Sequence, residues 1–229
     1  DGEPAVALHH ARKMMGDFEI QPSFVFVEQR NIESVPAFWR QQLIWDQGTY
    51  LARIGHRYLS VHFLKKGERK YETYNSTLLP QITNWLNVFH ETLNGSRKSF
   101  PIERIGFGYL NVFSFPETGF DLSRYLKLNI GVGGECAKAG IGAIEINTEI
   151  FHPATQSHVH VNVLVRAEPQ STGHITLRTK VEAQKRAEQD FPFTEQEMLL
   201  KEIAKTKAAA KEVFFDLATE YTHELMGAQ

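Results

Sequence analysis

The chain has 229 residues, of which 42% are hydrophobic and 23% are charged, and its formal net charge is −2 at pH 7. This composition is typical of a globular protein. The chain has no overall positive excess that would indicate binding to nucleic acid or to an acidic membrane. A net charge this small still allows a local basic patch. No stretch approaches the roughly 20 apolar residues of a membrane-spanning helix, so we expect no membrane association.

The chain contains a single cysteine, Cys136, so an intramolecular disulfide is excluded. Cysteine usage of this kind is typical of reducing compartments, and the N-terminus carries no signal-peptide pattern. We therefore expect a cytoplasmic protein. No histidine lies close to Cys136 in the sequence, which argues against a catalytic thiol.

Between residues 41 and 115 the sequence alternates between strand-like and helical patterns. Gln47-Gly48 is the predicted turn between the first two of three short strands, which span residues 41–46, 49–56 and 58–64. Apolar residues recur every three or four positions from Tyr71 to Leu93 and predict a helix, in which Pro80 either begins the main part or bends it. The segment from Ile102 to Phe115 alternates again. It predicts a long strand with one shared face: Ile105, Phe107, Tyr109, Asn111 and Phe113.

The second half begins with a glycine-rich segment, Gly131 to Gly142. It matches neither a phosphate-binding P-loop nor a dinucleotide fingerprint, so we interpret it as a connection between strands. An amphipathic helix is predicted from Thr194 to Met226, with Thr194 and Glu197 as its capping box. A straight helix of that length would be about 50 Å long, which exceeds the expected width of the rest of the domain. We therefore expect it to kink, to protrude or to pack against a second subunit. Between the glycine-rich segment and this helix we predict three strands, at residues 143–151, 158–167 and 174–184.

These elements predict an α+β fold in which a largely antiparallel sheet is covered by helices. Their order suggests two α+β halves, residues 1–116 and 117–229, which we expect to form one compact unit. The second half consists of a β-sheet and the long C-terminal helix.

Three segments together resemble a known family. They are the hairpin and helix from Leu43 to Phe89, the strand Arg104-Ile105-Gly106-Phe107-Gly108-Tyr109-Leu110-Asn111, and the terminal helix with Phe214-Phe215 and Leu225-Met226-Gly227. They are similar to a sporadically distributed family of uncharacterised prokaryotic proteins with an R-I-G-x-x-Y-x-N strand in mid-chain. The resemblance implies the same fold from about residue 40 onward and carries over no catalytic residues. The patchy distribution of this family suggests that its genes belong to mobile or defence islands.

His158-Val159-His160 is the strongest candidate for a metal site, because two histidines two positions apart on a strand point the same way. If the last two predicted strands form a hairpin, His158 lies near Glu182 and His160 near Lys180. A neighbouring cation would repel a metal ion. We therefore predict that no metal binds here and that the histidines lie on an ordinary solvated face.

This hairpin is predicted to have one buried and one polar face. The buried face is aliphatic and includes Val161 and Val163. The polar face gathers a basic strip, which we expect either to bind phosphate, nucleic acid or an acidic protein surface, or to be a plain exposed face. The basic strip consists of His158, His160, Arg166, His174, Arg178 and Lys180.

Two further polar or aromatic positions are candidates for binding. Asn111 lies on an apolar strand face and must find hydrogen bonds, for which backbone partners are favoured over a ligand. Trp39 and Trp85 are interpreted as core or rim residues. Trp45, in a predicted exposed position beside Asp46, is a plausible binding aromatic.

The apolar stripe of the terminal helix is longer than one small sheet can cover. We expect the part from Val213 to Leu225 to pack on the sheet, which would leave the earlier part exposed for pairing with a second copy. The alternative is a kink between Lys205 and Lys207 that folds the first part back onto its own domain. The predicted self-association surface consists of Leu199, Leu200 and Ile203.

The leading functional interpretation is a non-enzymatic binding or assembly component with a protein partner, in a defence or mobile-island system. The alternative is a small-molecule or nucleotide-binding regulator, and the third is a metal-dependent hydrolase that uses His158 and His160. The first interpretation involves no catalytic residue, no cofactor and no metal. It is compatible with a homodimer and with an anionic or nucleic-acid ligand.

Overall fold

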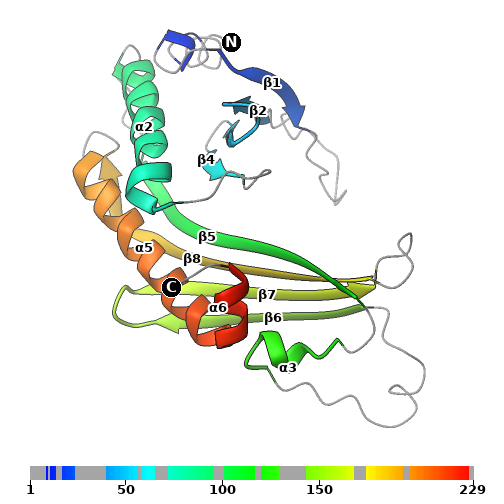
Figure 1. Ribbon diagram of the computed structural model, residues 1–229. Helices are drawn as coiled ribbons and strands as arrows, with labels where there is room; N and C mark the ends of the chain where they lie inside the picture. Colours follow the sequence, from blue (N-terminus) through cyan, green and yellow to red (C-terminus); the bar gives the residue numbers. More distant parts are fainter. Residues whose placement is uncertain are drawn as a thin grey trace, which may run out of the picture. The chain divides into compact units, whose positions relative to one another are not determined.

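The structure is a computed structural model that describes residues 9, 11–13, 17–23, 40–55, 58–64, 72–94, 101–116, 120–128, 143–167, 174–192 and 196–226. The chain divides into two compact units, Asp1–Ser99 and Phe100–Gln229. Each unit contains a four-stranded antiparallel sheet with helical elements packed on it (Figure 1). This confirms the predicted α+β fold. No helix within the described ranges is long and apolar enough to span a membrane.

The first unit has the strand order β1-β2-β3-β4 followed by a helix. A π-helical turn, η1 (Tyr74–Leu78), leads directly into α2 (Leu79–Asn94), as the apolar periodicity predicts. Pro80 is the second residue of α2, where the π-helical turn gives way to the α-helix. Pro80 therefore belongs to the start of the helix and does not bend its middle. The strands are β1 (Glu19–Ser23), β2 (Arg40–Trp45), β3 (Tyr50–Gly55) and β4 (Tyr58–Phe63).

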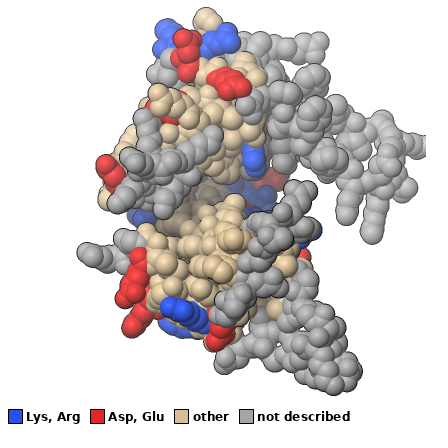
Figure 2. Space-filling view, turned by 45° about the vertical axis from the view of Figure 1, so that its right-hand side comes forward, with Lys and Arg blue, Asp and Glu red and all other residues tan. Residues whose placement is uncertain are grey.

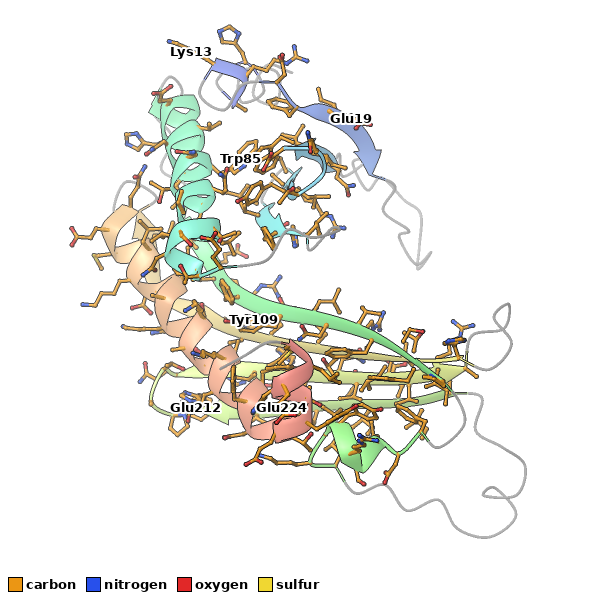
Figure 3. The ribbon with its side chains drawn as sticks, viewed as in Figure 1. Lys13, Glu19, Trp85, Tyr109, Glu212 and Glu224 are labelled. Atoms are coloured by element: carbon orange, nitrogen blue, oxygen red, sulfur yellow. The ribbon has the colours of Figure 1, made fainter. Side chains whose placement is uncertain are left out.

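Trp85 of α2 is the largest side chain in the core of the first unit and is fully buried. It packs with Leu43 of β2, Ala52 of β3 and Val88 of its own helix. Figure 3 shows Trp85 turned from the helix toward the strands. Trp45 packs against the same core and stacks on Tyr50, with ring centroids 5.5 Å apart. The prediction of an exposed Trp45 is therefore wrong, because its ring has been drawn into the aromatic cluster of the hairpin.

The second unit contains a sheet with the order β5-β8-β7-β6. Strand β5, which precedes residue 117 in the sequence, pairs along almost its whole length with β8 and therefore belongs to this unit. Helix α5 (Gln196–Leu217) packs on β5, β8 and β7. The strands are β5 (Pro101–Pro116), β6 (Ala143–His152), β7 (Ser157–Ala167) and β8 (His174–Pro192).

The hairpin of β7 and β8 has the predicted faces but a different register. Val161 and Val163 are 4% and 0% exposed, which confirms the buried valine face. His158 lies opposite Gln184, and His160 lies opposite Glu182, so the register is shifted by two residues from the predicted one. Loop geometry sets hairpin register, and a shift of two positions leaves every side chain on the same face. The face pattern therefore could not distinguish the two registers.

The C-terminal helix is interrupted, which corrects the prediction of one element up to Met226. It consists of α5 and α6 (Glu220–Met226), and between them Ala218 forms a β-bridge with Leu126. Thr219 donates a backbone hydrogen bond to the carbonyl of Tyr125 (3.1 Å), and the buried hydroxyl of Thr222 donates another to the same oxygen (2.6 Å). These bonds tie the helix break to α3 (Leu122–Tyr125).

The predicted self-association surface is not exposed as a whole. Leu199 is only 5% exposed, and Leu200 and Ile203 are half-buried. The first part of α5 lies on its own unit, where Glu202 is bonded to Lys185 of β8, as the alternative expected, although α5 is one continuous helix from residue 196 to residue 217. Leu225, which was expected to pack on the sheet, is 46% exposed.

A buried carboxylate connects α5 to the sheet. Glu202 of α5 accepts hydrogen bonds from Lys185 of β8 (3.1 Å) and from Lys205 one turn along the helix. Burial alone would raise the pKa of Glu202, but the hydrogen bonds from the two lysines outweigh it and hold this pKa below its usual value. Glu202 therefore stays ionised at neutral pH as a polar cross-link beneath the helix.

Candidate binding face of the second sheet

The sheet of the second unit has one face covered by α5 and one face that we call the open face. Side chains alternate between the two, as strand geometry requires. On β7 the burial pattern switches at almost every residue, from buried Val159 to exposed His160 and back to Val161. The side chains of the open face that concern its function are Leu110, Val112, Glu145, Asn147, Glu149, His158, His160, Asn162, Arg178, Lys180 and Glu182.

All six residues of the predicted basic strip lie on the open face. His158, His160 and Arg166 lie on β7, and the other three lie on β8 at positions of the same parity. The sequence predicted Glu182 beside the histidines, but it did not predict that Glu149 of β6 also lies there. Glu182 of β8 is opposite His160, and β6 adds Glu149 on the other side of the same histidine. The strip is therefore of mixed charge.

Glu149 joins the two histidines that were considered as metal ligands. Its Oε1 lies 2.5 Å from Nδ1 of His158, and its Oε2 lies 3.7 Å from Nδ1 of His160. The predicted neighbour of His160, Lys180, is instead opposite Asn162. The histidines thus face a carboxylate, and repulsion by a cation no longer argues against a metal. Within the described ranges, no three His, Cys, Asp or Glu side chains are grouped to hold a metal ion.

An amide network occupies the middle of the open face. Asn162 donates hydrogen bonds to Glu145 (2.8 Å) and to the side-chain oxygen of Asn147 (2.6 Å), and it accepts one from Arg178 (3.2 Å). The hydrogen bonds from Asn162 and Asn147 lower the pKa of Glu145, which therefore stays ionised at neutral pH. The network connects β6, β7 and β8 and fixes the positions of the charged groups at its two ends.

A second network runs along β8 toward β5. Glu182 pairs with Lys180 and accepts a hydrogen bond from Gln184 (2.8 Å), which in turn accepts one from Arg104 (3.2 Å). Burial would raise the pKa of Glu182, but the hydrogen bonds from Lys180 and Gln184 lower it overall. Gly108 lies opposite Glu182 on β5, and a Cβ there would approach the Cβ of Glu182 to 3.3 Å. The glycine leaves room for the glutamate side chain.

The open face is hollowed between the two networks. An open depression of about 580 Å³ lies over β6, β7 and β8. The Nε of Arg178, one of its lining residues, is buried and has no hydrogen-bond partner among the described residues. The depression is lined by Asn147, Thr148, Glu149, His160, Val161, Asn162, Arg178, Lys180 and Glu182.

Two exposed aliphatic side chains border the cationic part of the open face. Leu110 and Val112 of β5 are 62% and 60% exposed. Leu110 lies directly opposite Lys180, and Val112 lies directly opposite Arg178. We call these four residues the ledge. Leu110 and Val112 alternate with the apolar residues of the inner face, and this alternation in the sequence already indicates that they are exposed.

The charged residues of the surface are otherwise mixed. Figure 2 shows one side of the molecule, on which small groups of basic and acidic side chains are separated by other residues. No extended patch of a single sign is visible among the described residues on that side. The described residues on that side therefore offer no broad surface of one charge to a partner.

Asn111, a further predicted candidate, does not lie on the open face. Asn111 lies on the inner face of β5, next to Tyr109, whose ring approaches Phe214 of α5 with centroids 6.2 Å apart (Figure 3). Cys136, the glycine-rich segment 131–142 and Trp39 lie outside the described residues. The open face is therefore the principal candidate site.

Comparison with known proteins adds no relative: no family model, no curated protein and no solved structure matches the chain. The class that fold and site define is an α+β protein with a solvent-facing antiparallel sheet, and its function must be argued from the residues of that sheet.

Proposed function

We propose that the chain is a non-enzymatic binding component that holds a protein partner on the open face, with the ledge as the anchor. The observation that carries this proposal is the pairing of exposed aliphatic and cationic side chains. Leu110 is next to Lys180, and Val112 is next to Arg178. Isolated apolar side chains are common on protein surfaces, but adjacent ones bordered by charges are typical of interaction sites.

The chemistry of the ledge defines the kind of partner. An apolar side chain of the partner would cover Leu110 and Val112, and full burial of an aliphatic side chain stabilises a complex by about 1.5–3 kcal/mol. An acidic side chain of the same partner would pair with Arg178, since guanidinium groups bind carboxylates through two parallel hydrogen bonds. The partner is therefore expected to present an acidic and apolar segment.

The carboxylates of the open face also favour binding over catalysis. Glu145 and Glu182 accept hydrogen bonds from neighbouring side chains, and Glu149 lies within hydrogen-bond distance of His158. Such contacts hold the shape of the surface and lower the basicity of a carboxylate, as they do for Glu145 and Glu182. A general base requires the opposite, a pKa raised toward neutrality.

A second candidate is a small anionic ligand held by Arg178 in the depression. The observation in its favour is the volume, about 580 Å³, which is within the range of roughly 300–1,000 Å³ of small-molecule sites. The depression is open, however, and most of its lining residues are polar or charged, whereas such sites are mostly concave and apolar. A protein partner is therefore the better-supported function.

The proposal is tested by affinity capture from cells of the natural source, with recovered proteins quantified by mass spectrometry. The double variant Leu110→Ser, Lys180→Glu changes the ledge. The matched control, Met198→Ser with Lys201→Glu, changes an exposed methionine and an exposed lysine on α5. We expect the ledge variant to lose a specific partner at least about tenfold, equivalent to about 1.4 kcal/mol, and the control to retain it.

Equal recovery of every specific partner by the ledge variant and the native chain would overturn the proposal, provided that both melt at the same temperature. Recovery of no specific partner, together with a rise in melting temperature on adding a small anion, would also overturn it. That result would favour the ligand-binding alternative.

A further inference from the structure

We infer that β6 pairs with β6 of a second copy of the chain, which joins two four-stranded sheets into one continuous sheet. Strand β6 is at the edge of its sheet, and no described strand pairs with its outer side. It is ten residues long. An open edge of this length is a ready template for another strand, and proteins usually protect such edges with charges, prolines or bulges.

The inner side of β6 carries none of these protections. Its inward positions are uncharged up to the final histidine, and residues 143–152 contain neither proline nor glycine. The principal contacts of α5 with the sheet are on β5, β8 and β7, so the helix leaves the β6 side less covered. Ile150 is 42% exposed, and its neighbour Phe151 is 56% exposed. The inward positions are Ile144, Ile146, Thr148 and Ile150.

The side chains of β6 are complementary to those of a second, antiparallel copy of β6 in one register. In an antiparallel pair, facing residues lie on the same side of the sheet, so a two-fold axis must pass through a single residue position. An axis through Glu145, Asn147 or Glu149 would bring glutamates of the two copies face to face, which is destabilising. For an axis near the middle of the strand, these exclusions leave the inward positions.

Thr148 is the inward position that gives the longest pairing without a clash of charge. With the axis there, Ile146 lies opposite Ile150 of the second copy, and Thr148 lies opposite Thr148. On the open face, Asn147 lies opposite Glu149 of the second copy, so an amide faces a carboxylate. Aliphatic pairs and amide–carboxylate pairs across strands are both favourable. This complementarity identifies a second copy as the occupant of the edge.

Pairing through β6 would also complete the depression. Asn147, Thr148 and Glu149 line it on the β6 side, where the second copy would place its own Asn147 beside Glu149. The ledge lies on β5 and β8, the two strands farthest from β6 in the sheet. A dimer joined at β6 would therefore leave both ledges free and present two partner sites at the two ends of one sheet. The inference stands independently of the proposed function, since pairing requires no residue of the ledge.

Cysteine cross-linking at the axis tests this inference. In a Cys136→Ser background, Thr148→Cys places two thiols opposite each other at about 4.5–5.5 Å between Cα atoms, a separation at which a disulfide forms. Ile144→Cys is the matched control, because its two copies would be about 27 Å apart at 3.4 Å per residue. We expect a covalent dimer from Thr148→Cys and none from Ile144→Cys under the same mild oxidation.

Sedimentation equilibrium across micromolar concentrations supplies the second readout. The chain with native β6 is expected to dimerise, and Ile150→Lys is expected to weaken dimerisation at least about tenfold, whereas Leu110→Lys at the other edge leaves it unchanged. A monomer at every concentration would overturn the inference, whatever covers the edge instead. A dimer that Ile150→Lys leaves intact and that Thr148→Cys fails to cross-link would overturn it as well.

Discussion

Replacing Val163 with aspartate is expected to unfold the second unit. Val163 is fully buried in the middle strand β7, on the face beneath α5, opposite Ile146 and Thr179. A carboxylate there would lose its hydration, and Thr179 is the only polar side chain opposite it in the strand pairing. The cost should exceed about 4 kcal/mol, close to the whole stability of a typical domain.

The adjacent residue provides the control. Leu164 lies on the open face between Glu145 and Arg178, so Leu164→Asp would place its new charge beside one anion and one cation, at a cost of less than about 1 kcal/mol. Urea denaturation followed by far-UV circular dichroism measures both variants. Similar losses at Val163 and Leu164 would show that the sheet is buried on both faces, and the open face would not exist.

Replacing Trp85 with alanine is expected to destabilise the first unit by about 3–5 kcal/mol. The ring is fully buried between α2 and the hairpin, with Trp45 at a centroid distance of 6.0 Å. Its removal would leave a large cavity in a small core. Loss of the contact with Trp85 would also expose Trp45, whose fluorescence should shift toward that of a solvated indole.

Phenylalanine is the matched control at this position. The indole Nε1 of Trp85 is buried and has no hydrogen-bond partner among the described residues. Trp85→Phe removes this unsatisfied donor and keeps most of the apolar volume, so its cost should stay below about 1.5 kcal/mol. The two variants are compared by chemical denaturation. Equal costs would contradict the packing described for this core.

The elements of the fold were largely predictable because their patterns are local. The valine alternation of β7 and the apolar periodicity of α2 each require only the neighbouring residues to be recognised. The break between α5 and α6 was not predictable in the same way. It depends on Thr219 and Thr222 meeting the carbonyl of Tyr125, which is more than ninety residues away in the sequence. An uninterrupted stripe gives no sign of such a contact.

The candidate site was predictable only in part, because it too depends on contacts between residues that are distant in the sequence. The face shared by His158 and Lys180 follows from alternation alone, whereas their true neighbours depend on register. Glu149 of β6 lies beside the histidines, and Leu110 of β5 lies beside Lys180. The sequence did not predict the order of these strands in the sheet. A basic strip in the sequence therefore became a face of mixed charge with an apolar border.

The functional role of the open face is tested most directly by lysine labelling of the chain in native complexes. Lys180 belongs to the ledge and its side chain is 51% exposed, and Lys201 on α5 is the exposed reference. Complexes recovered from the natural source are acetylated before dissociation, and the modification of each lysine is compared with that of the isolated chain. The account predicts strong protection of Lys180 and unchanged labelling of Lys201. Equal labelling of Lys180 in the complex and in the isolated chain would contradict it.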